Sequence, residues 1–285
     1  MKALLTGIII LAAIEVSLGQ SFELLGVEYA TYPSAAVNEI DSVASSFTEL
    51  EVSANYPVFR KEKWMLLAGV TCRLVIPESE DRLVNDNLLF IGLQLSGIFN
   101  ISDNKKLIFT ALPALSTTDE LGQLSGNNFL MQGGALFRKQ VSERFSYTLG
   151  IVSTSRFGFP LLMPSVGLSH AGDKMKLDVN LPFLAQTMWN YQNSFSYGVK
   201  LSVNGSQYNF NNESFNGTEV KLAQFSRLRL GPEIQYRIKG PFVLTLFGGI
   251  TVNRNYVFEL EGGDTLDFGL ENGPFLAAKI SLKPK

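Results

Sequence analysis

Gln224 to Asn253 reads QFSRLRLGPEIQYRIKGPFVLTLFGGITVN, two alternating runs that meet at Lys239 and Gly240. Because a β-strand sends successive side chains to opposite faces, each run has an apolar face and a polar face. The apolar faces hold Leu228, Leu230, Ile234, Tyr236 and Ile238, then Phe242, Leu244, Leu246, Ile250 and Val252; the polar faces hold Arg227, Arg229, Glu233, Gln235 and Arg237, then Thr245, Gly249, Thr251 and Asn253. The stretch predicts a long antiparallel hairpin with one apolar face and one polar face.

The same period of two recurs along the rest of the chain. Strands are expected over residues 22–32, 46–59, 64–76, 87–101, 107–115, 128–139, 144–155, 161–170, 174–181, 183–189, 195–208, 222–238, 242–253 and 273–282. Pro182 predicts a sharp reversal, because proline cannot donate a hydrogen bond to a central ladder. The pattern favours 14 strands, or 12 if the chain does not reverse at Pro182.

Short polar turns alternate with longer polar loops between these strands. The short turns include residues 60–63, 102–105 and 140–143. Bacterial outer-membrane barrels have short turns on the periplasmic side and longer loops outside. The pattern therefore predicts that these turns, and the one at Lys239-Gly240, are periplasmic.

Two architectures are compatible with the alternation. In a soluble sandwich the apolar faces point inward, whereas in a membrane barrel they contact lipid. Segments such as 195–208 exceed the roughly 5 to 6 residues of a typical globular strand, and closure removes the edges that they would expose. Aromatic residues also stand near strand ends, where interface girdles lie: Tyr56, Phe59, Trp64, Phe99, Phe145, Trp189, Tyr191, Tyr208, Phe242 and Tyr256. These features favour the barrel.

The first residues indicate export. A short basic start, an apolar run from Ala3 to Ile14 and small residues before Gln20 are typical of a secretory signal peptide. We expect residues 1–19 to be that peptide and residues 20–285 to form a single outer-membrane β-barrel domain.

Composition excludes several other classes. The chain has one cysteine, Cys72, so no intramolecular disulfide can form. After the signal peptide no run of 18 or more apolar residues occurs, so no transmembrane helix is expected. The formal net charge of −2 gives no electrostatic argument for binding nucleic acid.

Several short motifs carry a family resemblance. They are LIFTALPALS at 107–116, RFGFP at 156–160, PSVG at 164–167, and Leu181-Pro182 before an alternating strand. With these motifs the chain resembles a family of uncharacterised outer-membrane β-barrels of Bacteroidetes-type bacteria, and the resemblance covers most of the mature chain. It implies location and architecture, and no reaction. One departure is the C-terminus, which reads Leu282-Lys-Pro-Lys285 where such barrels commonly finish on an aromatic residue that assembly machinery reads.

In a barrel the charged faces line the lumen. The candidates for lining and selectivity are Glu49, Glu51, Arg73, Lys176, Asp178, Lys200, Arg227, Arg229, Glu233 and Arg237, and Lys279 shares their inward parity. One interpretation is a constriction that sorts polar or anionic solutes. The other is that opposite charges pair across strands and plug a narrow lumen. Eight strands are filled by side chains and 16 to 18 leave an aqueous channel, so 14 strands are compatible with either.

His170 is the only histidine, and Ser169 precedes it. Some outer-membrane lipid hydrolases use a Ser/His pair, which makes these two residues the candidates for catalysis. Adjacent strand residues face opposite ways, so we expect the two side chains to diverge and His170 to be a solvated turn residue. The sequence has no glycine-rich phosphate loop, metal cluster or triad spacing, so neither a cofactor nor a metal is expected.

These observations predict an all-β, transmembrane up-and-down antiparallel β-barrel in the bacterial outer membrane. The expected function is porin-like passage of small polar or anionic solutes through a charged lumen, without catalysis. The alternatives are a closed structural or interaction barrel that acts through its outer loops, and a lipid-modifying enzyme at Ser169 and His170. The expected partners are outer-membrane lipid and lipopolysaccharide, the outer-membrane assembly machinery, and small solutes.

Overall fold

The computed structural model describes residues 23–36, 44–79, 86–118, 124–192, 194–210, 214–215 and 218–283. The expected signal peptide lies outside these residues. Fourteen long strands are present: β1 (Leu25–Ala36), β2 (Ala44–Arg60), β3 (Trp64–Ser79), β4 (Leu88–Ser102), β5 (Lys105–Thr118), β6 (Phe129–Ser142), β7 (Phe145–Thr154), β8 (Leu161–Ala171), β9 (Met175–Leu181), β10 (Leu184–Gln192), β11 (Phe195–Asn209), β13 (Thr218–Lys239), β14 (Phe242–Leu260) and β16 (Gly273–Leu282). Two short strands, β12 (Ser214–Phe215) and β15 (Thr265–Asp267), lie in the loops beside them.

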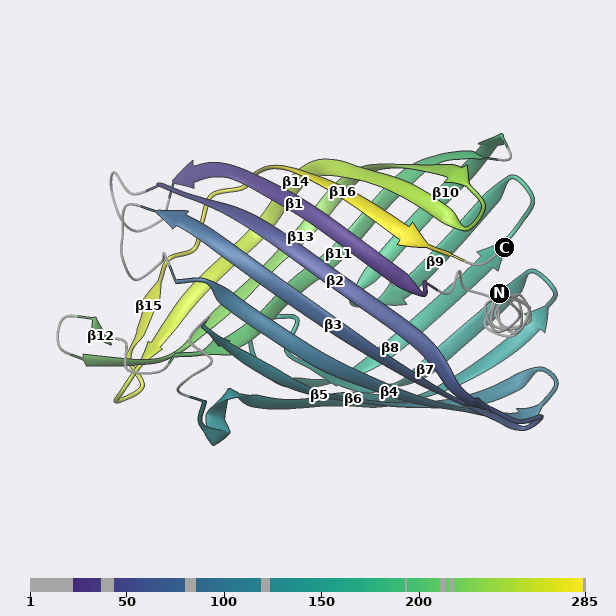
Figure 1. The fold of residues 1–285 in the computed structure, drawn as a ribbon, viewed down its shortest axis with the longest axis horizontal. Helices are drawn as coiled ribbons and strands as arrows, with labels where there is room; N and C mark the ends of the chain where they lie inside the picture. The colour runs from purple at the N-terminus through teal and green to yellow at the C-terminus, as the bar shows by residue number, and fades with distance from the viewer. Residues whose placement is uncertain are drawn as a thin grey trace, which may run out of the picture.

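The fourteen long strands form a closed antiparallel barrel (Figure 1). Each pairs with the next along the chain, and β1 pairs with β16 from Leu25↔Leu282 to Thr31↔Leu276. The fold class and the preferred count of 14 strands are confirmed. The closing strand ends at Leu282 although no aromatic residue stands there.

β13 and β14 show why the alternating pattern closes into a barrel. They pair over most of their length around a turn at Gly240, whose φ of 61° suits a residue without a Cβ atom. Leu230 and Ile234 face outward and are 37% and 41% exposed, whereas Arg229 and Glu233 face inward and are 7% and 1% exposed. Hence the apolar side of the hairpin is the outer surface of the barrel, and the charged side lines the lumen.

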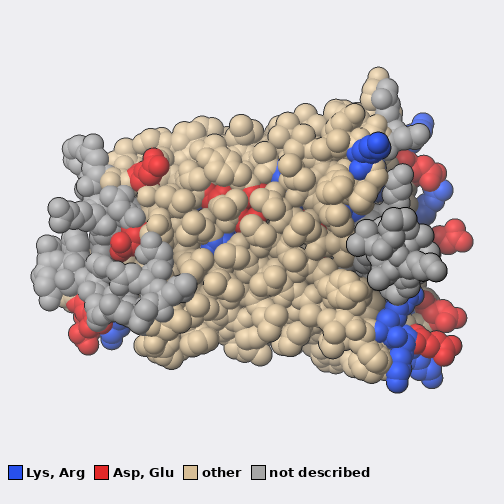
Figure 2. Space-filling model, in the orientation of Figure 1, with Lys and Arg blue, Asp and Glu red and all other residues tan. Residues whose placement is uncertain are grey.

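The outer surface of the barrel is largely apolar. Figure 2 shows few charged atoms along the middle of the visible face, with most of the Lys, Arg, Asp and Glu side chains at its ends. Rings of Phe59, Trp64 and Phe99 stack beside one another near the short turns, as expected for an interface girdle. The prediction was wrong for Tyr208 and Tyr256, because both are fully buried inside the barrel.

The connections differ at the two ends of the barrel. The short turns other than the one between β9 and β10, the start of β1 and the end of β16 lie at one end, called here the tight-turn end, and the longer loops lie at the other (Figure 1). The turns predicted at 60–63, 102–105, 140–143 and Lys239-Gly240 all fall at the tight-turn end. Pro182 lies between β9 and β10, which pair antiparallel, so the predicted reversal is confirmed.

An apolar cluster fills the lumen toward the loop end. Its members come from β1 to β5, β11, β13, β14, β16 and the segments next to them, and several are aromatic. They include Tyr32, Phe47, Val75, Leu88, Phe90, Tyr208, Phe210, Val220, Phe225, Tyr256 and Phe258. Tyr256 contacts the rings of Phe47, Phe225 and Phe258 with centroid distances of 5.8, 5.5 and 4.7 Å. We call this set the apolar cluster.

β11 leans into the lumen near the loop end and meets β5. Asn209 pairs with Thr117 in a parallel arrangement, and the Ser116 hydroxyl donates to the Gln207 carbonyl oxygen. The β7–β8 connection, residues 155–160, packs on the same segment, with Ser155 Oγ 3.3 Å from Ser206 Oγ. We call this junction the seam. It narrows the loop end of the barrel to the ring of β1 to β5, β11, β13, β14 and β16 that surrounds the apolar cluster.

Candidate functional site: the lumen

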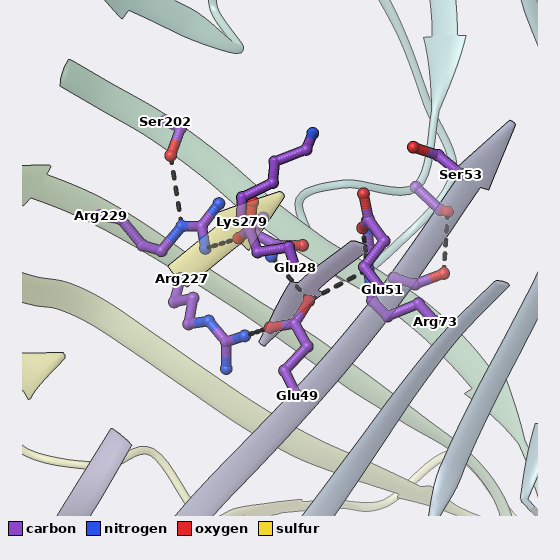
Figure 3. A network of polar contacts seen from close by, with 12 residues as sticks. Glu28, Glu49, Glu51, Ser53, Arg73, Ser202, Arg227, Arg229 and Lys279 are labelled. Carbon is purple, nitrogen blue, oxygen red and sulfur yellow. Dashed lines mark hydrogen bonds and ion pairs between the residues drawn. The ribbon is translucent and has the colours of Figure 1, made fainter. Parts of the chain in front are cut away.

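Glu49 on β2 lies at the centre of a network of polar contacts inside the barrel (Figure 3). Its carboxylate is 4% exposed and forms ion pairs with Arg227 of β13 and with Arg73 of β3, the latter at 3.1 Å. Asn204 of β11 donates to the same carboxylate at 2.9 Å, and the Tyr32 hydroxyl donates to it at 3.3 Å. Because β2 and β13 are not neighbours in the sheet, these contacts cross the lumen.

Arg229 makes a second contact across the interior. Its Nη1 donates to Oε1 of Glu28 on β1 at 2.8 Å, and its Nε donates to the Ser202 hydroxyl at 3.3 Å. Arg73 completes this part of the network by donating to Glu51 at 2.7 Å. Charge-assisted hydrogen bonds of this length are among the stronger ones in proteins.

Two further pairs extend the network toward the tight-turn end. Lys200 Nζ lies 3.1 Å from Oε2 of Glu233, and Gln186 and Gln235 each donate to Oε1 of that carboxylate at 2.6 Å. Lys279 Nζ lies 2.7 Å from Oε1 of Glu23. The lumen is therefore polar toward the tight-turn end, whereas the apolar cluster fills it toward the loop end.

We call the whole set the charge belt: Glu23, Glu28, Glu49, Glu51 and Glu233 with Arg73, Lys200, Arg227, Arg229 and Lys279. Each carboxylate of the belt is paired with one of its cations, and the two signs are present in equal number. Arg227 also connects the belt to the apolar cluster, because its guanidinium lies 3.6 Å from the ring centroid of Tyr32 and 4.8 Å from that of Phe225.

A polar cavity of about 540 Å³ lies inside the barrel between the charge belt and the tight-turn end. We call it the vestibule. Its lining includes Ser169, Lys176, Asp178, Asn190, Ser196, Arg237 and Lys283. Gln186 and Gln235, which bond Glu233 of the belt, also line it. Burial lowers the pKa of the Lys283 ammonium, which lies beyond the last strand.

The structure places all ten predicted lumen residues inside the barrel, in two groups. Glu49, Glu51, Arg73, Lys200, Arg227, Arg229 and Glu233 belong to the charge belt, as does Lys279. Lys176, Asp178 and Arg237 line the vestibule. Their role in selectivity stays a prediction.

Sequence reasoning missed several partners of these residues. Glu28 stands between the outward-facing Val27 and Tyr29, so its parity marks it as a lumen residue. Tyr32 and Asn204 also bond Glu49. Glu23 falls in the predicted strand 22–32 with the parity of the outward-facing Leu25 and Val27, but in the structure it precedes β1.

Ser169 and His170 both border the vestibule. Ser169 pairs with Ser146 and His170 with Phe145 on β7, at the end of β8. No hydrogen bond joins the serine hydroxyl to the histidine ring. The two residues therefore lack the nucleophile-to-base contact that the hydrolase hypothesis requires.

Within the described ranges, no group of three or more His, Cys, Asp and Glu residues is placed to hold a metal ion. Of the segments that the structure describes, none is a helix long and apolar enough to cross a membrane.

A closed antiparallel barrel with an apolar outer face and a charged lumen defines a transmembrane β-barrel protein. The chain belongs to the family described as "Domain of unknown function (DUF6268)", whose profile matches residues 49–264.

Three solved structures illustrate what the fold is similar to. The COG4313 outer membrane channel from Pseudomonas putida F1 has 11% identity and a TM-score of 0.43, over 93% of this chain and 96% of that one. The translocator domain of the autotransporter NalP from Neisseria meningitidis has 12% identity and a TM-score of 0.40, over 99% and 95%. The NanC porin has 10% identity and a TM-score of 0.38, over 91% and 99%. A search of curated proteins finds no match.

Proposed function

We propose that the chain is an outer-membrane β-barrel that passes small polar or anionic solutes through its lumen. The vestibule is the observation that carries the proposal. A barrel packed with side chains along its whole length leaves no such volume, whereas this one holds about 540 Å³ of polar space against the charge belt. The open space lies inside the barrel, on the side of the charge belt from which a solute would enter.

The outer surface and the connections support the location. The apolar outer face would contact outer-membrane lipid and lipopolysaccharide, and insertion would depend on the outer-membrane assembly machinery. The division into short turns and longer loops supports an orientation with the tight-turn end in the periplasm.

Passage to the loop end requires side chains to move. In this structure, the charge belt and the apolar cluster lie between the vestibule and the loops. The ion pairs across the lumen would have to separate, and the aromatic rings above them would have to part. The structure therefore corresponds to a closed state of the proposed channel.

Conductance of the purified full-length chain in planar lipid bilayers tests the proposal. We expect discrete current steps at moderate voltage in potassium chloride, and no steps from the same sample after heat unfolding. Folding is checked beforehand by the heat-dependent shift of the barrel on a denaturing gel. A folded barrel that gives no steps over the accessible voltage range would contradict the proposal.

The second candidate is a closed barrel that acts through its outer loops. The apolar cluster favours it, because twenty buried apolar residues pack together across the loop end. Such a core stabilises a rigid platform for the loops. The bilayer experiment separates the two, since this candidate predicts a folded protein without current.

A further inference from the structure

We propose that the vestibule is a binding site for small oxyanions, solutes that carry a carboxylate, phosphate or sulfate group, and that its basic side chains set the charge preference of the lumen. The inference deepens the proposed function by naming the solute class and the residues that select it. It assigns that role to the vestibule, which holds the sequence candidates Lys176, Asp178 and Arg237, and not to the charge belt, which holds the other seven.

The charge belt is electrically balanced. Its five carboxylates are each held by a cation of the belt at ion-pair distance, so a mobile ion meets little net charge there. Binding at the belt would also require an ion to displace an existing partner. A preference for one sign of charge must then arise elsewhere in the lumen.

The part of the lumen nearest the tight-turn end has an excess of positive charge. Lys176 and Arg237 line the vestibule. Lys106 faces Arg138 across β5 and β6, and Arg138 donates to the inward hydroxyl of Ser146 at 2.8 Å, so both cations also point inward. Two carboxylates line the vestibule, Asp178 and Asp173. Asp173 is paired with Arg144 at 2.9 Å, so its charge is offset.

Two of the basic side chains are available to a ligand. Lys176 is exposed to the vestibule and has no ion pair with a described residue. The Arg237 side chain makes one hydrogen bond with a described residue, of 3.3 Å from its Nη1 to the carbonyl oxygen of Gly240. Guanidinium and ammonium groups form their strongest hydrogen bonds with oxyanions. Ser169 and Ser194 add hydroxyl groups to the same wall.

The enclosing wall strengthens the effect of these charges. A net positive charge inside a low-dielectric wall concentrates the electric field and raises the local concentration of anions. The vestibule opens where the largely exposed Asp173 borders it, so an anion would be captured from the tight-turn end. The site would be reached before any solute meets the charge belt.

Labelling of an engineered thiol measures the charge of the vestibule whether or not the barrel conducts. Ser169→Cys is introduced in a Cys72→Ala background, and its reaction rates with an anionic and a cationic methanethiosulfonate are compared. In each reaction the thiolate attacks the reagent sulfur, a disulfide forms and a sulfinate leaves. We expect the anionic-to-cationic rate ratio, normalised to a small free thiol, to be on the order of tenfold or more.

Matched variants locate the source of that preference. Lys176→Gln and Arg237→Gln should each lower the rate ratio at least about threefold, because each removes one charge from the vestibule. Lys174→Gln, an exposed turn lysine outside the vestibule, should leave the ratio unchanged. A ratio near one in the parent protein, or equal loss in all three variants, would falsify the inference.

Competition shows whether an anion occupies the site. Citrate or inorganic phosphate should slow the anionic reagent more than chloride does at the same ionic strength. Equal slowing by all three salts would show screening without a site and would overturn the proposal of binding.

Bilayer currents distinguish failure of this inference from failure of the proposed function. Reversal potentials in a potassium chloride gradient should show anion preference that weakens in Arg237→Gln. Current steps without anion preference would support the channel function and contradict the inference. A strong labelling preference with no current would support the binding site and contradict the channel function.

Discussion

At the scale of single residues, Glu49 has four polar partners, more than any other belt carboxylate that the structure describes. It is buried and bonds Arg227, Arg73, Tyr32 and Asn204. Glu49→Gln keeps the shape of the side chain but removes its charge and leaves Arg227 without its carboxylate. Because an uncompensated buried charge is costly, we expect a loss of about 3 kcal/mol or more in the free energy of unfolding. Urea unfolding of the barrel in lipid vesicles measures it.

Glu51→Gln is the matched control for that measurement. Glu51 lies two residues along the same strand, is 26% exposed and pairs with Arg73 alone. Its removal should lower the free energy of unfolding by about 1 to 2 kcal/mol, because Arg73 keeps its ion pair with Glu49. Equal losses in the two variants would show that Glu49 is not the centre of the network.

Parity identified most of the belt residues but none of its pairings. Arg227 and Glu49 stand far apart in sequence and on strands that are not neighbours, so their contact depends on the register of the whole barrel. The prediction that Tyr208 and Tyr256 lie in the interface girdle failed for a related reason. A tyrosine at a strand end is suited to the membrane interface and equally to an interior cluster, and local sequence does not distinguish the two.

At the scale of elements, the seam depends on the absence of a side chain at Gly205 of β11. A Cβ atom built there would lie 2.6 Å from the carbonyl oxygen of Arg156 and 2.7 Å from the Cα atom of Ser226. Gly205→Ala should therefore push the β7–β8 connection away from β11 and lower the midpoint of thermal unfolding by several degrees. Gly126→Ala, where a Cβ atom meets nothing within 4 Å, should leave the midpoint unchanged.

The strands themselves were largely predictable, whereas the seam was not. The period of two set the boundaries of β8 to β11 to within a few residues, and Pro182 marked the turn between β9 and β10. The inward lean of β11 follows from its contact with β5, which is distant in sequence. In retrospect the run Asn204-Gly-Ser206 is a sequence signal for this inward lean, because small polar residues allow both faces of a strand to be covered.

At the scale of the whole molecule, the apolar cluster and the charge belt are the two obstacles to passage. Tyr256→Ala removes a fully buried ring that contacts three others in the cluster. We expect it to raise the frequency or size of current steps in bilayers. Tyr236→Ala, which removes an exposed ring from the outer face of β13, should leave the currents unchanged. Unchanged currents in both variants would place the obstacle at the belt.

Closure, strand number and the outward direction of the apolar faces followed from alternation, because a long strand with one apolar face has few stable arrangements. The way in which side chains fill the lumen did not follow from alternation. It depends on how the volumes of inward side chains from all strands add up at each level, and parity gives direction without volume. Hence the sequence left a channel and a plug equally open, whereas the structure has a cavity at one end and a packed core at the other.

The balance of the charge belt has an electrical consequence. Moving one elementary charge through a potential of 100 mV changes the energy by about 2.3 kcal/mol, which is how charged segments sense voltage. A belt with equal numbers of carboxylates and cations carries almost no net charge when it shifts as a unit. Opening of this barrel would then be nearly independent of the membrane potential and would depend on the solute that reaches the belt.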